Sequence, residues 1–502
     1  MAMSSVYIDT LGCFKNQEDS ERAAGLLESS GFAVAGSPDE ADVVMVNTCG
    51  FIEDAKRESI DRVLELARQK GRGAKLIVSG CLSQRYPGEI FEEIPEADAV
   101  IGVNEYERLP EIVAELLGEG AREPRREAMP DPNRAGSNDG EGENGRRADG
   151  RILMTGGKPG ILTGPRIRET AGATAYLKIA EGCNNRCAYC AIPAIRGPYR
   201  SVPHDILVGE AVSLVAAGAR ELVLIAQDVS AYGSDFGHDD SLSDARGNNS
   251  NNGNSPHALP RLIEGIIGAA CGAAEGSGID WIRLMYCYEE RVTDELIEAI
   301  AKHREVCNYI DIPLQHISDS VLARMGRRST RVSIEGTISR LRAAVPDIAI
   351  RTTLMTGFPG ESESDFTELL DFVSEQRFER LGVFAYSPED GTPAADMPDQ
   401  IPRELAEERR DVIMRRQLEI SLEKNRSRVG RTMKVLVEES EEDGEAAGIA
   451  AGGYCYVGRT EYDAPEIDGS VIFSSEAPIR IGSFADVLIT DAMDYDLVGK
   501  AL

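Results

Sequence analysis

The sequence predicts an α/β protein with three folded parts: an open α/β domain, an open six-stranded (β/α) partial barrel and a small all-β barrel. The first two parts alternate apolar, strand-like runs with amphipathic helical segments. The last part contains strand-like runs only. A chain of 502 residues has room for two to four domains. The expected ranges are 1–120, 173–400 and 430–502, with a flexible linker at 121–172 and a helical connector at 401–429.

In the N-terminal part, a cysteine stands just after each predicted strand. Strands are expected at 6–9, 43–46 and 76–78, with helices at 16–30 and 53–69. The cysteines that follow these strands are Cys13, Cys49 and Cys81. Ligands of open α/β sheets bind beyond the carboxyl ends of the strands, so three thiols could meet at one edge and hold a metal cluster. The alternative is three unrelated apolar residues, because cysteine is often buried.

Residues 121–172 are rich in Arg, Glu, Gly, Pro and Asn and show little periodicity, which predicts a flexible linker. The Asn-rich stretch 238–257 has the composition of a surface insertion without a catalytic role.

The central part repeats a strand-then-helix pattern six times, which favours an open relative of the (β/α) barrel. Strands are expected at 174–180, 221–226, 280–286, 308–313, 348–355 and 380–386. Helices between them include 205–217, 292–302 and 363–375. Active sites of such barrels lie at the carboxyl ends of the strands. The polar residues expected there are Gln227-Asp228, Gln315-His316 and the segment Gly357 to Glu361.

Directly after the first barrel strand, three cysteines lie within eight residues: Cys183, Cys187 and Cys190. A structural zinc site normally has four ligands, and no fourth is obvious nearby. Three thiolates on a cubane of four irons leave one iron open for another ligand. Incidental or zinc-binding cysteines are the alternative interpretation.

This spacing, with Tyr189 before the last cysteine, resembles the radical S-adenosylmethionine (SAM) superfamily. The resemblance implies that Cys183, Cys187 and Cys190 hold a 4Fe–4S cluster and that SAM binds beside it. The residues that we then expect to line the SAM pocket are Tyr189, Gln227, Gly357, Pro359, Gly360 and Glu361.

Short motifs around the N-terminal cysteines resemble those of the methylthiotransferases. The motifs are Gly12-Cys13 with Asn16 and Asp19-Ser20-Glu21, then Asn47-Thr48-Cys49 and Gly80-Cys81. The resemblance implies that Cys13, Cys49 and Cys81 hold a second 4Fe–4S cluster.

The C-terminal part begins after a charged helix expected at 402–427. Strands are expected at 432–438, 454–459, 470–474 and 484–490, which favours a small barrel that resembles the TRAM domain. That domain usually binds RNA, but residues 430–502 hold fifteen acidic and five basic residues, a net charge of −10. Phosphate binding needs the opposite sign, although the charge could also serve solubility alone.

Gly458-Arg459-Thr460 and the loop Asp463 to Gly469 resemble one branch of the methylthiotransferases. That branch modifies an aspartate of protein twelve of the small ribosomal subunit. We therefore expect a ribosomal-protein aspartate methylthiotransferase, with short specificity contacts around Arg459 and this loop. The alternatives are a tRNA adenosine methylthiotransferase, with tRNA as partner, and a non-enzymatic iron–sulfur assembly or RNA-binding protein.

The resemblance also implies the reaction. An electron from a flavodoxin or ferredoxin cleaves SAM at the first cluster, and the resulting radical removes hydrogen from the aspartate β-carbon. A second SAM methylates a sulfur on the N-terminal cluster, and the methylthio group is transferred to the carbon radical.

Composition indicates a cytoplasmic protein without a membrane partner. The net charge is −31, and no apolar run approaches the length of a membrane span. The N-terminal residues lack the pattern of a signal peptide. Ten cysteines in such a chain suggest reduced thiols rather than disulfides. Four cysteines without paired spacing are expected to be structural: Cys271, Cys287, Cys307 and Cys455.

Overall fold

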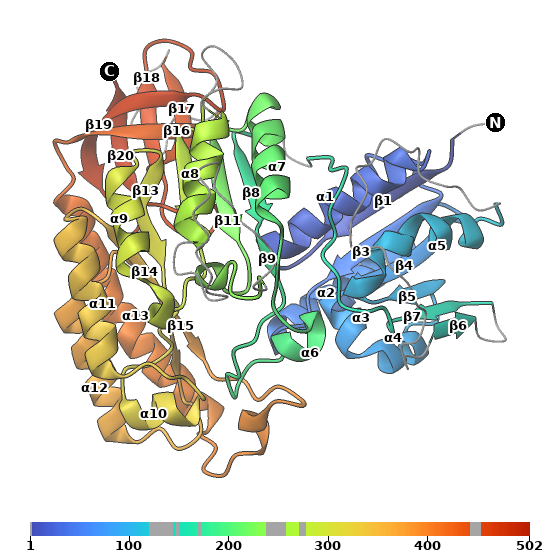
Figure 1. Cartoon of the computed structure of the whole chain (residues 1–502), viewed down its shortest axis with the longest axis horizontal. Coiled ribbons are helices and arrows are strands. Elements are labelled where there is room, and N and C mark those ends of the chain that lie inside the picture. Colours follow the sequence, from blue (N-terminus) through green and yellow to red (C-terminus); the bar gives the residue numbers. More distant parts are fainter. Residues whose placement is uncertain are drawn as a thin grey trace.

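The computed structural model describes residues 3–119, 144–146, 150–168, 172–236, 258–270, 278–441 and 453–502. The Asn-rich stretch, Cys271 and much of the expected linker lie outside these residues. The N-terminal sheet stands beside the central sheet, and the C-terminal strands gather at one end of the central sheet (Figure 1).

The N-terminal sheet has the order β2-β1-β3-β4-β5-β7-β6, and all its pairings are parallel except β6 with β7. Its apolar strands β3 and β5 are buried along their whole length, as expected for a sheet covered on both faces. Its elements are β1 Ser5–Thr10, α1 Phe14–Ser29, β2 Ala33–Val34, β3 Val43–Thr48, α2 Glu53–Gln69, β4 Lys75–Gly80, α3 Cys81–Arg85, α4 Pro87–Glu93, β5 Ala99–Ile101, η1 Val103–Arg108, α5 Leu109–Leu116, β6 Asn144–Arg146 and β7 Ile152–Met154.

The strand β7 corrects the expectation of a linker between the first two sheets. Residues 121–172 were expected to form a flexible linker, yet β7 lies within that range and pairs with β5. Three consecutive apolar residues, Ile152 to Met154, are buried against the sheet. So short a run leaves no periodicity to detect in a polar segment.

The central sheet has six parallel strands in the order β15-β14-β13-β12-β11-β8, which confirms the predicted open barrel. Its elements are β8 Thr174–Lys178, β9 Ala180–Glu181, α6 Ile192–Arg196, β10 Arg200–Ser201, α7 His204–Ala216, β11 Glu221–Ile225, η2 Val229–Ala231, α8 Ala258–Ala270, β12 Trp281–Leu284, η3 Glu289–Arg291, α9 Asp294–Lys302, β13 Val306–Asp311, α10 Asp319–Arg324, α11 Arg331–Ala344, β14 Ala349–Thr356, α12 Glu363–Gln376, β15 Arg380–Ala385 and η4 Pro393–Asp396.

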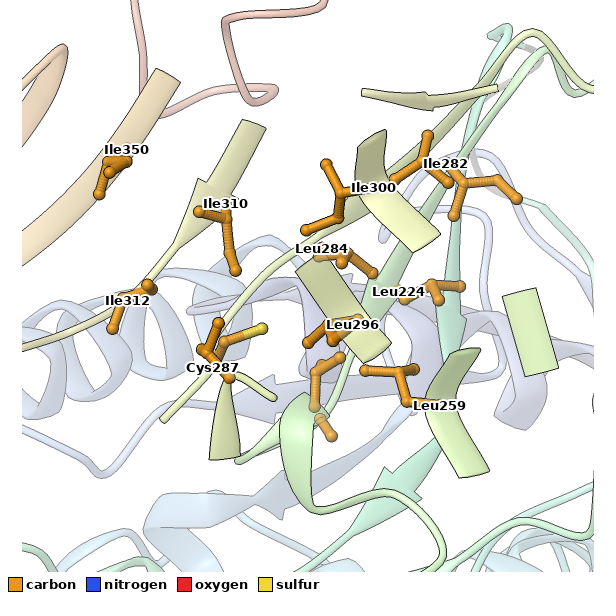
Figure 2. Close-up of a cluster of buried hydrophobic side chains, with 14 of the residues drawn as sticks. Leu224, Leu259, Ile282, Leu284, Cys287, Leu296, Ile300, Ile310, Ile312 and Ile350 are labelled. Atoms are coloured by element: carbon orange, nitrogen blue, oxygen red, sulfur yellow. The ribbon is translucent and has the colours of Figure 1, made fainter. Parts of the chain in front are cut away.

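The helices pack on the outer face of this sheet through an aliphatic core. Figure 2 shows Leu284 of β12 and Ile310 of β13 near Leu296 and Ile300 of α9. Each fully buried Leu or Ile contributes about 1.5–3 kcal/mol, so this layer holds the strands and their carboxyl ends in place. Cys287 lies fully buried in the same cluster, which agrees with a structural role.

The C-terminal strands form a closed barrel of order β16-β17-β18-β20-β19, as predicted, and a connecting helix precedes them. The elements are α13 Arg403–Arg426, β16 Thr432–Glu441, β17 Tyr454–Arg459, β18 Val471–Ser475, β19 Phe484–Ala492 and β20 Leu497–Ala501. Neither α13 nor any other helix of the described residues combines the length and apolar character that crossing a membrane requires.

Buried ion pairs join the C-terminal barrel to the amino-terminal ends of the central strands. Glu221, at the start of β11, accepts hydrogen bonds from Arg283 at 2.7 Å and from Arg459 at 2.6 Å. Asp463 pairs with Arg380 of β15, and Asp468 accepts a hydrogen bond from the Tyr309 hydroxyl at 2.7 Å. The loop 463–469 therefore closes the floor of the central sheet. We call Glu221, Arg283, Arg351, Arg380, Arg459, Asp463 and Asp468 the floor cluster.

Replacing Glu221 with Gln is expected to lower the free energy of unfolding by about 3–5 kcal/mol, because Arg283 and Arg459 then lose their shared buried anion. Thermal and denaturant unfolding at neutral pH measure this loss. The exposed Glu439→Gln, in the same barrel, is the matched control and should change stability little.

The ion pairs of Glu221 with Arg283 and Arg459 also predict that the stability of the fold depends on pH. Burial opposes the ionisation of Glu221, but Arg459 and Arg283 outweigh burial and hold its pKa at about 2, below the ordinary 4.5. A depressed pKa stabilises the fold above the ordinary value, and this stabilisation is lost as the pH falls towards the folded pKa. The stability difference between wild type and Glu221→Gln should therefore shrink between pH 4.5 and about 2. An unchanged difference over that window would contradict this account.

Candidate active site at the cysteine loop

The cysteine loop, residues 182–191, connects β9 to α6 at the carboxyl end of the first barrel strand. The backbone N–H of Cys183 donates to the Gly197 carbonyl at 3.1 Å, and that of Ala188 donates to the Met325 carbonyl at 2.8 Å. These bonds tie the loop to α6 and to the segment after α10. Cys183 and Cys187 are buried and Cys190 is half-buried.

The three thiols of this loop act on one another electrostatically. Burial raises the pKa of Cys183 to about 11. Burial, with the neighbouring Cys187 and Cys183 thiols, raises the pKa of Cys190 to about 12. The Cys187 sulfur lies 3.2 Å from the Tyr288 hydroxyl. The raised pKa values keep the Cys183 and Cys190 thiols protonated at neutral pH until a metal replaces the protons, as in a metal-binding apo site.

The N-terminal thiols also converge, each at the carboxyl end of a strand. A Cβ on Gly12, whose φ is +97°, would lie 2.7 Å from the Cys49 Cβ, so only glycine allows this approach. Asn16 joins the three loops: its amide donates to the Leu11 carbonyl at 2.8 Å and to the Thr48 carbonyl at 3.3 Å, and its oxygen faces Cys81. Burial, then the Cys81 and Cys13 thiols, raise the pKa of Cys49 to about 12.

The two thiol sets meet through α6. Cys81 packs against Ala191 and Ile195, directly after Cys190. The Arg196 guanidinium donates to the Cys81 sulfur at 3.2 Å and to the Asn16 amide oxygen at 2.8 Å. Residues of the two sheets that lie more than a hundred positions apart thus form one site.

A buried ionic network surrounds Arg196 and ties α1 to β8 and β9. Arg196 pairs with Asp19 at 2.6 Å and with Glu181 at 3.3 Å. Lys178 pairs with Asp19, with Glu18 at 2.9 Å and with Glu181 at 3.1 Å. Removing one partner from such a network leaves a buried charge uncompensated, so the network fixes how the two sheets dock.

The residues expected in the SAM pocket surround the cysteine loop. Gln227 donates to Glu181 at 2.6 Å, while its own amide oxygen is buried without a hydrogen-bond partner in the described residues. The Tyr189 ring meets the Phe358 ring edge-on at 6.5 Å. Gln227 therefore has capacity left for a polar ligand, and Tyr189 reaches the segment after β14.

The segment Gly357 to Glu361 forms a tight turn after β14. Gly357 has a φ of +75°, and a Cβ there would lie 2.2 Å from the Ala406 Cβ. The Glu361 carboxylate accepts from the Gly357 N–H at 2.7 Å and from Arg409 at 2.7 Å. Gly360 accepts a hydrogen bond from Arg324 through its carbonyl at 2.7 Å, and so does Pro359 at 3.2 Å. Glu361 thus holds the turn with both oxygens, and the turn faces the loop through Phe358.

Arg327 contributes to this site, although no sequence pattern pointed to it. Arg327 is buried over the Tyr288 ring at 4.4 Å, and within the described residues its Nε and Nη2 have no hydrogen-bond partner. Together with the Gln227 oxygen, these orphaned polar atoms suit a bound ligand with charged and polar ends, as SAM has. Three thiols without a fourth ligand suit a cubane with one open iron. Within the described residues, no three His, Cys, Asp or Glu side chains form a site for a single metal ion.

The expectation of specificity contacts around Arg459 and the loop 463–469 is wrong for two of its charged residues, Arg459 and Asp463. Arg459 is 3% exposed and Asp463 is 1% exposed, and both belong to the floor cluster. Their charges are complementary to those inside the central sheet, so they anchor the C-terminal barrel.

Comparisons with known families agree with this division of the chain. Residues 5–102 match an uncharacterised protein family, UPF0004, residues 177–373 match the radical SAM superfamily, and residues 429–502 match the TRAM domain.

Among solved structures, the radical SAM methyltransferase TsrM from Kitasatospora setae superposes with a TM-score of 0.53 and 14% identity. The match covers 88% of this chain and 81% of that chain. At this identity the likeness concerns the fold.

Two relatives match along nearly the whole length. The ribosomal protein uS12 methylthiotransferase RimO of Acetivibrio thermocellus is 43% identical, covering 99% of this chain and 98% of the relative. That of Desulforamulus reducens is 42% identical, covering 99% of both chains. With a radical SAM domain, a TRAM domain and these full-length relatives, the chain belongs to the ribosomal protein uS12 methylthiotransferase family of radical SAM enzymes.

Proposed function

We propose that this enzyme attaches a methylthio group to the β-carbon of an aspartate in ribosomal protein uS12. The observation that carries the proposal is the contact between Cys81 and Ala191, next to Cys190, because it joins a thiol of the N-terminal set to the cysteine loop. A reaction that needs both a radical and a sulfur donor requires such proximity.

We assign Cys183, Cys187 and Cys190 as ligands of the 4Fe–4S cluster. When bound, that cluster supplies the electron that cleaves SAM. The protein's part is to hold SAM and exclude water. Tyr189 and the turn Gly357 to Glu361 form one wall, while the orphaned atoms of Gln227 and Arg327 offer an acceptor and donors to the polar ends of SAM.

We further propose that Cys13, Cys49 and Cys81 hold a second 4Fe–4S cluster. The support is their shared place at the sheet edge and the contacts that Asn16 makes with all three loops. Arg196 would orient the Cys81 sulfur and partly balance its negative charge. The electron donor in this proposal is a flavodoxin or ferredoxin, and the enzyme works in the cytoplasm, where thiols stay reduced.

Given both substrates in one tube, the reconstituted enzyme should place the methylthio group on uS12 and leave unmodified tRNA unchanged. The C-terminal domain carries a net charge of −10, which attracts a basic ribosomal protein and repels phosphates. Mass spectrometry of the uS12 peptides and of tRNA digests measures the outcome. Because attraction between exposed charges is screened over roughly 10 Å at 0.1 M salt, association with uS12 should slow as salt rises. A methylthio group on tRNA and none on uS12 would contradict the proposal that uS12 is the substrate.

A further inference from the structure

Lys15 is a buried cation that contacts no carboxylate within the described residues. It stands two residues after Cys13 in the first turn of α1 and is 9% exposed. Its ammonium lies 3.7 Å from the centre of the Tyr286 ring. In the part of the chain that the structure describes, this ammonium has no ion pair or hydrogen bond. A cation–π contact is therefore the direct contact that the described residues give this ammonium.

The neighbouring buried cations are compensated. Lys178 contacts three carboxylates, and Arg196 contacts two carboxylates and a thiol. Lys15 differs from these cations, because no carboxylate of the described residues lies within ion-pair distance of its ammonium. A buried ammonium without such a partner, two residues after Cys13, suits an anion that enters the site.

The Tyr286 ring under Lys15 is held in a strained conformation. Tyr286 follows β12 and has a φ of +58°, which is unfavourable for a bulky residue. Its N–H donates to Asp311 at 2.9 Å, and its carbonyl accepts from the Val229 N–H at 3.1 Å. The barrel thus fixes the ring as a platform at the carboxyl end of its strands, where barrel enzymes bind substrates.

Ionisable groups of several elements act on the ammonium. Besides Tyr286, the groups that act on Lys15 electrostatically are Cys13, Glu181 and Arg196. Cys13 belongs to the proposed sulfur donor, and Glu181 contacts Gln227 in the proposed SAM pocket. A small anion bound by Lys15 would therefore have the two halves of the reaction on either side.

We propose that Lys15 binds the side-chain carboxylate of the substrate aspartate, with the Tyr286 ring beneath the ammonium. This inference rests on the proposed function and deepens it. The reaction at the β-carbon leaves the adjacent carboxylate intact, so one ammonium both selects aspartate and orients the carbon. Asparagine has nearly the same shape without the charge and would be bound less tightly.

The test measures binding of uS12 to the reconstituted holoenzyme without reductant, by calorimetry. Two forms of uS12 are compared: one with its target aspartate and one with asparagine in its place. Wild type should prefer the aspartate form by about tenfold to a hundredfold, as for a charge-assisted hydrogen bond. Lys15→Met should lose this preference and bind the asparagine form as wild type does. Lys15→Arg should keep most of the preference, and Lys302→Met, at an exposed lysine, should not alter it.

The results separate this inference from the proposed function. Wild type that neither binds nor modifies uS12 would contradict the proposed function. Wild type that modifies uS12, with the same aspartate preference in Lys15→Met, would overturn the role of Lys15 alone. Iron content is measured for Lys15→Met and for Lys15→Gln. Loss of iron from both variants would mean that Lys15 helps the N-terminal thiols to hold iron, and it would also overturn the proposal.

Discussion

Replacing Cys183, Cys187 and Cys190 together with Ala is expected to abolish the cleavage of SAM and remove about half of the iron. Wild type reconstituted without oxygen should carry about eight irons, in two cubanes of four. Of the six proposed ligand thiols, the variant keeps only the three N-terminal ones, which follow strands of another sheet. Iron analysis and chromatography of 5′-deoxyadenosine measure the two losses.

Buried cysteines outside the two sets provide the matched control. Cys287 and Cys307 are fully or almost fully buried among apolar side chains of the barrel. Their change to Ala leaves a small cavity but removes no proposed ligand, so the iron content should stay at the wild-type value. Full iron content in the Cys183, Cys187, Cys190 variant would overturn the assignment of the cysteine loop.

Replacing Cys13, Cys49 and Cys81 with Ala is expected to abolish methylthio transfer while SAM cleavage persists. The pocket residues around the cysteine loop belong to the barrel, and the N-terminal thiols contact it through Cys81 and α6. Removing those thiols therefore spares the cleavage machinery. 5′-Deoxyadenosine and methylthio-uS12 are measured in the same reaction.

The decisive outcome is the ratio of the two products. Cleavage without transfer supports the second cluster. Transfer at the wild-type rate would mean that the three N-terminal cysteines have a structural role only. Loss of both products with the fold intact would mean that the N-terminal sheet also shapes the SAM pocket.

The long elements were predictable because each carries a complete pattern of its own. The helix expected at 53–69 is observed with those bounds, and all six barrel strands lie within a few residues of their expected places. The missed strands, β2, β5, β6, β7, β10 and β20, have two to five residues. So few residues show no alternation, and their neighbours in the sheets decide their structure.

In the candidate site, too, the predictable residues are those whose pattern is complete within a short stretch of sequence. The cysteine loop was visible because its thiols lie within eight residues of sequence. The contact of Arg196 with Cys81 spans 115 positions and exists only in the fold. The sequence shows that Lys15 is close to Cys13, but a lysine in a polar helix gives no sign that it is buried. Arg459 was misinterpreted because a charged residue beside a loop suggests recognition, whereas Arg459 ends β17 and pairs inside the protein.

The floor cluster has a consequence for building chimaeras between members of the family. A C-terminal barrel grafted from another protein would have to bring counterparts of Arg459, Asp463 and Asp468. Without them, Glu221 would lose one of its two arginine partners and keep Arg283, and Arg380 and Arg351 would lose carboxylate partners. The C-terminal barrel and the floor of the central sheet must therefore be exchanged together. Changes of substrate preference must be made at the exposed strands, with the loop 463–469 left in place.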